Sequence, residues 1–161
     1  MTVLSPKITI YTDGACLGNP GPGGYGVVLL DGQQRRELAA GYRLTTNNRM
    51  EMMAAIAGLE ALTTPSTVTL YSDSQYLVDA VMKGWAKRWR ANGWKRNAKD
   101  KAKNPDLWAK ILGLCEQHQV TFIWVRGHAG NVENERCDRL AVAAANGQER
   151  LLDQGFEVST V

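Results

Sequence analysis

Two aspartates each close a short run of apolar and hydroxyl residues. The runs are ITIYTD over residues 8–13 and VTLYSD over residues 68–73, and they share one pattern of apolar, Thr, apolar, Tyr, hydroxyl and Asp. Both have the composition of a β-strand. If the strands are parallel neighbours, about 4.8 Å apart, Asp13 and Asp73 project side by side at one edge of the sheet. Carboxylates that close repel each other, and a divalent cation such as Mg²⁺ removes the conflict.

Each aspartate also has an ordinary structural interpretation. Asp13-Gly14 is a common turn sequence, and Asp73 could cap a helix that begins near Ser74. Either interpretation suffices for one aspartate alone. The matched pair favours a metal site, because both ordinary roles would have to fall at the same place in two similar runs.

Two further acids lie in predicted helices. Glu51 is in the first turn of a helix over residues 48–62, and with Asn48 as N-cap it would be the glutamate of a capping box. Asp138 lies in a helix over residues 132–145, on the face that carries Ala141, Val142 and Ala145. A charge on a packed face needs a cation or a base. The alternative is that Asp138 lies at the edge of that face and stays solvated.

His128 lies in the loop RGHAG, just before that last helix, whose N-cap we expect to be Asn131. A single loop histidine is usually a surface residue. This one is expected near Asp138, and the ordinary pKa of histidine suits proton transfer.

The net charge of +3 is unevenly distributed. Residues 83–103 hold nine Lys or Arg and one acid, a net charge of +8, whereas the remainder has ten basic and fifteen acidic residues, a net charge of −5. Trp85 and Trp89 are four residues apart, on one helical face, with Lys87, Arg88 and Arg90 around them. Basic residues interleaved with aromatic residues are typical of nucleic-acid binding. The alternatives are a solvated charged face, or tryptophans that pack this segment onto the body.

The order of elements predicts a single α/β domain over residues 1–147, followed by a tail over 148–161. Strands are expected at 7–12, 25–30, 36–44, 68–73 and 120–125, and helices at 48–62, from about residue 74, at 105–117 and at 132–145. Residues 14–26 hold six glycines and two prolines and indicate a loop. We therefore expect a five-stranded mixed sheet, with three hairpin-linked antiparallel strands and two parallel strands, flanked by helices.

Length and composition exclude several classes of protein. The chain has 161 residues, of which 44% are hydrophobic and 22% charged, as in a globular domain rather than a disordered or fibrous chain. It has no apolar run of the roughly 18 residues that a membrane span needs, and no pattern of a signal peptide. Three cysteines at unrelated spacings favour a reducing compartment, so we expect a cytoplasmic protein, with a monomer as the default.

Four segments together resemble bacterial type 1 ribonuclease H, an endonuclease that cuts the RNA strand of RNA/DNA hybrids. The segments are YTDGACLGNPGPGGYG (11–26), TTNNRMEMMAAI (45–56), LYSDSQYL (70–77) and VRGHAGNVENERCDRLA (125–141). The resemblance extends in order over about residues 7–146, and the basic segment at 83–103 matches the basic protrusion of that family. The resemblance implies that the protein removes RNA primers and R-loops.

The resemblance also implies the roles of individual residues. Metal ligands would be Asp13, Glu51, Asp73 and Asp138, and these would hold two Mg²⁺ ions, with Mn²⁺ as a possible substitute. His128 would assist proton transfer and product release. Asn19, Asn47 and Gln75 would meet the minor groove of the hybrid, and Cys16, Thr46 and Asn48 would also face the substrate. The DNA strand would fall to Trp85 and the basic protrusion, including Lys87, Arg88 and Arg90.

The implied chemistry agrees with the physical reading. Four carboxylates carry about −4, which two divalent cations balance, and such a pair promotes in-line hydrolysis that leaves a 5′-phosphate and a 3′-hydroxyl. Three alternatives remain: a domain that binds hybrids without cutting, an integrase or transposase core that acts on DNA, and a structural domain whose acids are caps and turns. All four carboxylates and the hybrid-facing amides favour ribonuclease H.

The basic segment yields a first prediction. Replacing Lys87, Arg88 and Arg90 together with glutamine should weaken hybrid binding and flatten its salt dependence, because fewer counterions are released when the hybrid binds. The rate constant at saturating substrate should change much less. Measuring KM and kcat over a range of salt concentrations checks this, and an unchanged KM at moderate salt would contradict it.

Overall fold

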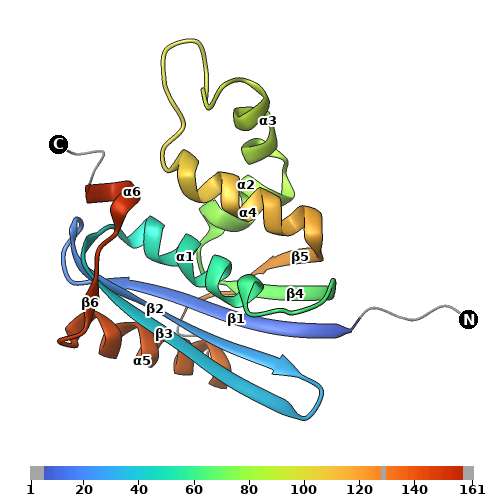
Figure 1. The fold of residues 1–161 in the computed structure, drawn as a ribbon, viewed down its shortest axis with the longest axis vertical. Helices are drawn as coiled ribbons and strands as arrows, with labels where there is room; N and C mark the ends of the chain where they lie inside the picture. Colours follow the sequence, from blue (N-terminus) through green and yellow to red (C-terminus); the bar gives the residue numbers. More distant parts are fainter. Residues whose placement is uncertain (1–5, 128–129, 158–161) are drawn as a thin grey trace, which may run out of the picture.

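Six strands form one mixed sheet in the order β5-β4-β1-β2-β3-β6 (Figure 1). The computed structural model describes residues 6–127 and 130–157. The strands are β1 (Lys7–Cys16), β2 (Gly21–Asp31), β3 (Gln34–Thr45), β4 (Thr67–Ser72), β5 (Gln119–Trp124) and β6 (Arg150–Leu151). β1, β2 and β3 are antiparallel neighbours, whereas β4 and β5 are parallel to β1. The predicted class and mixed sheet are confirmed, with one short strand, β6, beyond the five expected.

Helices cover both faces of this sheet. They are α1 (Asn47–Glu60), α2 (Gln75–Met82), α3 (Trp85–Ala91), α4 (Pro105–Gln117), α5 (Val132–Asn146) and α6 (Gln154–Glu157). Of the helices in the described residues, α5 lies on one face, across β1, β2 and β3, and α1 lies on the other with α2 and α4 beside it (Figure 1). α3 and the loop after it project from the body above α2 and α4. No helix in the described part of the chain is long and apolar enough to cross a membrane.

The two repeated runs of the sequence lie side by side in register. Ile8 pairs with Val68 and Tyr11 with Tyr71, so β1 and β4 are the parallel neighbours that the repeat predicts. The two tyrosine rings stack with centroids 4.9 Å apart. The hydroxyl of Thr12 then donates a hydrogen bond of 3.0 Å to the carbonyl of Tyr71. Matching side chains therefore lie level with each other as far as the ends of both runs.

The prediction of a loop over residues 14–26 is largely wrong. β1 continues through Asp13 and pairs with β2 as far as Cys16 and Gly23, so only residues 17–20 lie between the two strands. The glycines serve close packing instead. A Cβ on Gly24 would lie 2.5 Å from the carbonyl oxygen of Ala141 in α5, and one on Gly14 would lie 2.5 Å from the backbone nitrogen of Glu51 in α1. Helices can lie directly on the strands only because these side chains are absent.

An aromatic cluster attaches the projecting helix α3 to the body. The ring of Trp89 meets the edge of Trp108 with centroids 5.8 Å apart, and Tyr76 lies 5.8 Å from Trp108 and 6.3 Å from Trp89. Trp108 is fully buried in the main core. Such contacts bury large apolar area, so they hold a strongly basic segment against the domain.

The segment after α5 is joined to the domain by a buried ion pair. Asp153 is 2% exposed, and its carboxylate accepts hydrogen bonds from Arg49 at 2.8 and 2.9 Å and from the hydroxyl of Thr45 at 2.7 Å. Arg49 also donates to Asp106 at the start of α4, at 2.7 and 3.0 Å. The sequence gives no local sign of this attachment, because its partners are far apart in the chain.

The buried pair predicts a large loss of stability on truncation. Asp153→Ala should lower the free energy of unfolding by about 3 kcal/mol, because it leaves the guanidinium of Arg49 buried with only part of its compensating charge. Urea denaturation measures this. As a matched control, Asp79→Ala removes a carboxylate whose partner, Lys83, is largely exposed, and should cost under about 1 kcal/mol. Equal losses in the two variants would contradict the assignment.

Candidate active site

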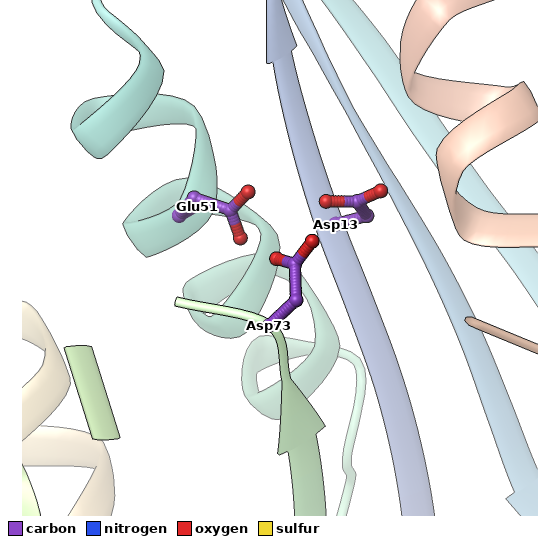
Figure 2. A group of neighbouring side chains, drawn as sticks. All are labelled: Asp13, Glu51 and Asp73. Atoms are coloured by element: carbon purple, nitrogen blue, oxygen red, sulfur yellow. The ribbon is translucent and has the colours of Figure 1, made fainter. Parts of the chain in front are cut away.

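Three carboxylates from three elements point toward one another (Figure 2). Asp13 comes from β1, Glu51 from α1, and Asp73 from the bend that follows β4. Each offers an oxygen that lies within 4.8 Å of the others, a spacing at which one ion could be shared. Asp13 and Glu51 are only 4% and 3% exposed, whereas Asp73 is half-buried. The sequence-predicted pair and Glu51 are therefore brought together at one place.

A single backbone amide orients two of these carboxylates. The N–H of Gly14 donates to Asp13 Oδ1 at 2.9 Å and to Glu51 Oε1 at 3.1 Å. This amide can come so close because Gly14 has no Cβ to collide with α1. Among the described residues, Glu51 Oε2 is then left for another partner.

Glu51 is not the capping-box glutamate that the sequence also allows. The N-cap of α1 is Thr46 rather than Asn48, and its hydroxyl accepts a hydrogen bond of 3.2 Å from the N–H of Arg49. Glu51 therefore lies beyond the first turn, with its side chain turned to β1. The prediction erred because Thr46 and Asn48 are both good N-caps.

Asp73 is likewise free of a capping role. Ser74 is the N-cap of α2, and its hydroxyl accepts from the N–H of Leu77 at 3.2 Å. The backbone carbonyl of Asp73 accepts a hydrogen bond of 3.1 Å from the indole of Trp124 at the end of β5. The backbone at Asp73 is thus held by a neighbouring strand, and its carboxylate faces Asp13.

Burial and mutual repulsion make the charged state of this cluster costly. Burial, with the nearby charges of Asp73 and Asp138, raises the pKa of Asp13 to about 8. Burial, with the charges of Asp13 and Asp73, holds the pKa of Glu51 well above its usual range. Within the described residues, Glu51 Oε2 is buried without a hydrogen-bond partner. The cluster therefore fits a hard divalent cation, because it offers several carboxylate oxygens and one of them lacks a hydrogen-bond partner.

Asp138 lies at the margin of the packed face of α5. The buried residues of this helix are Asn134, Cys137, Ala141 and Ala145, whereas Val142 is 40% exposed and Asp138 is half-buried. The solvated-edge alternative therefore describes its burial better than a place inside the stripe. Its charge still contributes to the raised pKa of Asp13, which places it near the cluster.

His128 lies outside the described residues, but both flanks of its loop are defined. A Cβ on Gly127 would lie 3.1 Å from Asp73 Oδ2, so the loop begins directly against the carboxylate cluster. Its other end is Asn131, which caps α5 as expected, accepting a hydrogen bond of 2.9 Å from the N–H of Asn134.

Most of the residues expected to face the hybrid lie around the start of α1. The side-chain oxygen of Asn19 accepts a hydrogen bond of 3.1 Å from the N–H of Asn47, which ties the turn after β1 to this helix. Cys16 ends β1, and its thiol donates to the carbonyl of Gly21 at 3.5 Å. Gln75 stands apart at the start of α2, exposed.

A groove of about 640 Å³ continues from this helix end. Its walls include Asn19, Thr46, Asn48, Lys101, Lys103, Asn104 and Phe156. Sequence reasoning placed Asn104 and Phe156 in no site. Nothing local in the sequence distinguished either residue; the left-handed backbone of Asn104 is visible only in the structure.

The basic segment carries a second groove, of about 560 Å³. Its walls are formed by Trp85, Arg88, Trp89, Asn92, Lys95, Arg96 and Asn97. Lys87 is exposed, whereas Arg90 is engaged in an ion pair of 2.8 Å with Glu116 of α4. The ammonium of Lys83 lies 5.6 Å from the ring centroid of Trp85. Positive charge and aromatic surface thus share one exposed face.

Fold and site together define a family. The family model described as RNase H matches residues 5–146, and the chain belongs to this family, whose enzymes are nucleases. The ribonuclease H of Trichodesmium erythraeum (strain IMS101) is 66% identical over 157 residues, which cover 98% of this chain and 100% of that protein. The ribonuclease HI of Synechocystis sp. is 68% identical over 151 residues, which cover 93% of this chain and 94% of that protein.

Solved structures agree with this assignment. LC9-RNase H1, described as a type 1 RNase H with the type 2 active-site motif, is 34% identical with a TM-score of 0.80, covering 100% of this chain and 83% of its own. LC11-RNase H1, solved in complex with an RNA/DNA hybrid, is 28% identical with a TM-score of 0.66, covering 86% of this chain and 96% of its own.

The raised pKa values predict an unusual pH dependence of stability. In the presence of chelator, Asp13 binds its proton more tightly in the folded than in the unfolded chain, so unfolding becomes easier as the pH rises from about 4 to about 8. The free energy of unfolding should fall by at least about 1.4 kcal/mol, the value of one pKa unit. Urea denaturation of the protein and of Asp13→Asn at several pH values measures this. Identical pH profiles would contradict it.

Proposed function

We propose that this chain hydrolyses the RNA strand of RNA/DNA hybrids at a site formed by Asp13, Glu51, Asp73 and Asp138. The observation that carries the proposal is a cluster of three carboxylates, two of them buried, in which Glu51 Oε2 lacks a hydrogen-bond partner among the described residues. Membership of the RNase H family supports the same reaction. The products are a 5′-phosphate and a 3′-hydroxyl.

The four carboxylates would hold two Mg²⁺ ions, for which Mn²⁺ can substitute. When bound, such a pair activates a water molecule and offsets the negative charge that develops on the leaving 3′ oxygen. The N–H of Gly14 binds one oxygen each of Asp13 and Glu51. Glu51 Oε2, which lacks a partner among the described residues, would be available to an ion.

His128 would act beside the carboxylates as a proton carrier. The described residues on either side of it include Gly127, which lies against Asp73, and Asn131, which caps α5. An imidazole can deliver a proton to the leaving oxygen near neutral pH. We assign it that role and a part in product release.

RNA would be distinguished from DNA at its 2′-hydroxyl. Asn19, Asn47 and Gln75 carry side-chain amides, which donate and accept hydrogen bonds as a hydroxyl does. Because the oxygen of Asn19 is engaged by the N–H of Asn47, its NH₂ group is the part left to donate to the sugar. Cys16, Thr46 and Asn48 would complete this surface.

The DNA strand would lie along the basic segment. Trp85, Lys87 and Arg88 are the contacts that the exposed surface favours, and Arg90 contributes less because Glu116 already pairs with it. Contacts of this kind recognise phosphates, so binding is tolerant of sequence and sensitive to salt. We also propose a cytoplasmic monomer that removes RNA primers and R-loops, and the three free cysteines fit a reducing compartment.

Asp13→Asn tests the metal site. The variant keeps the shape of the side chain but removes one ligand charge, so Mg²⁺-dependent cleavage should fall by about a thousandfold or more while the fold is retained. Cleavage of a labelled hybrid and circular dichroism measure the two effects. Asp31→Asn, at the exposed β2–β3 hairpin, is the control and should cleave normally. Near-normal activity of Asp13→Asn would overturn the assignment.

Substrate selection is tested in the same assay. Labelled RNA/DNA hybrid, duplex DNA and duplex RNA are each incubated with Mg²⁺ or with chelator. Cleavage of the RNA strand of the hybrid alone, and only with Mg²⁺, is expected. Cleavage of duplex DNA would indicate an integrase-like activity instead, and binding without cleavage would indicate a hybrid-binding module.

A further inference from the structure

Four charged side chains connect β3 to the first turns of α5. Arg35 binds Glu133 through two hydrogen bonds, of 2.8 and 3.1 Å, and Arg136 binds Glu37 through two, of 2.8 and 2.9 Å. Arg35 also donates to Glu37 at 2.8 Å, which joins the two pairs into one network. We call Arg35, Glu37, Glu133 and Arg136 the ion quartet. None of its four residues is assigned a role in the function proposed above.

The quartet lies at the start of α5, before the part of the helix whose backbone packs on glycines of the sheet. From Cys137 onward the backbone of α5 lies on the glycines of the sheet, as where Ala141 meets Gly24 and Ala144 meets Gly41. Cys137 also donates its thiol hydrogen to the carbonyl of Tyr11 at 3.2 Å. The turn before Cys137 leads back to the loop that holds His128. In that turn the quartet supplies the ion-pair contacts between helix and sheet.

Asp138 lies at the junction of these two parts of α5. It follows Cys137 directly, and it is two residues beyond Arg136. Its distance from Asp13 therefore depends on how the first two turns of the helix sit against β3. We infer that the ion quartet is a positioning device for Asp138, which sets this carboxylate against the other three; the inference rests on the proposed metal site.

The geometry of the quartet indicates that its ion pairs contribute enough free energy to hold the start of α5 in place. Isolated ion pairs at a protein surface contribute little, but two-pronged arginine–carboxylate pairs that share a member contribute more. The four side chains are 23% to 42% exposed, so water screens them only in part. Arg136, followed by Arg35, lowers the pKa of Glu37 to about 2, which keeps the network charged near neutral pH.

The chain supplies matched controls for the test. Arg36 is the neighbour of Arg35 on β3, but its side chain points to the opposite face of the strand. Arg139 lies one turn after Arg136 on α5 and is exposed. In the part of the chain that the structure describes, neither has a hydrogen-bonded carboxylate partner. Arg35→Gln and Arg36→Gln thus change the net charge equally, as do Arg136→Gln and Arg139→Gln.

Two measurements on the full chain decide the matter. Hydrogen exchange of the backbone amides of Asn134 to Asp138 is followed without metal, and Mg²⁺ affinity is measured by calorimetry without substrate. In Arg35→Gln and Arg136→Gln, exchange should accelerate and Mg²⁺ affinity should weaken, each by roughly threefold to tenfold. Arg36→Gln and Arg139→Gln should match the unaltered protein. The double variant of Glu37→Gln and Arg136→Gln should change the exchange rate and the Mg²⁺ affinity no more than the single variant with the larger effect, because both changes remove the same ion pair.

The outcomes separate this inference from the proposed function. Faster exchange with unchanged Mg²⁺ affinity would overturn the inference, because the quartet would then only stabilise the helix. Equal effects in the controls would also overturn it, because net charge would then explain the change. If the unaltered protein bound no Mg²⁺, the proposed metal site would fail and the inference with it, whereas the first two results leave that site intact.

Discussion

The repulsion among buried carboxylates is the constraint on which the rest of the structure depends. Asp13, Glu51 and Asp73 are held close by the backbone of three elements: β1, the N-terminal half of α1 and the bend after β4. Folding must supply the free energy that keeps these carboxylates together against their mutual repulsion. It does so through the core beneath them and through the Gly14 amide, which neutralises part of the charge of two carboxylates at once.

Glycine, rather than any polar residue, is what allows this crowding. With no side chains at Gly14, Gly24 and Gly26, the backbones of α1 and α5 lie directly on β1 and β2. The acids on both helices are thereby brought within reach of one sheet edge. The same closeness explains why charge near the site is distributed over four elements, and why the first turns of α5, which lack this packing, rely on ion pairs instead.

Sequence reasoning predicted the mixed sheet and three carboxylates that the structure brings together, but it missed contacts between residues far apart in the chain. The repeat ending in Asp13 and Asp73 sufficed to predict two parallel strands in register, because side-chain alternation and strand pairing are local rules. The glycine-rich stretch was misread because glycine favours turns and close packing alike, and only the opposing helix decides between them. The attachment of Asp153 was out of reach, since nothing near it in the chain indicates Arg49.

The pairing of Arg49 with Asp153 also constrains the order of folding. The two residues are 104 positions apart, so this contact closes one of the widest loops in the domain. The entropy of closing such a loop is lost before the contact returns any free energy. Arg49 is two residues from Glu51, on the same helix. Arg49 gains its buried partner only when the chain beyond α5 has docked, so the part of α1 next to Glu51 receives this support late in folding.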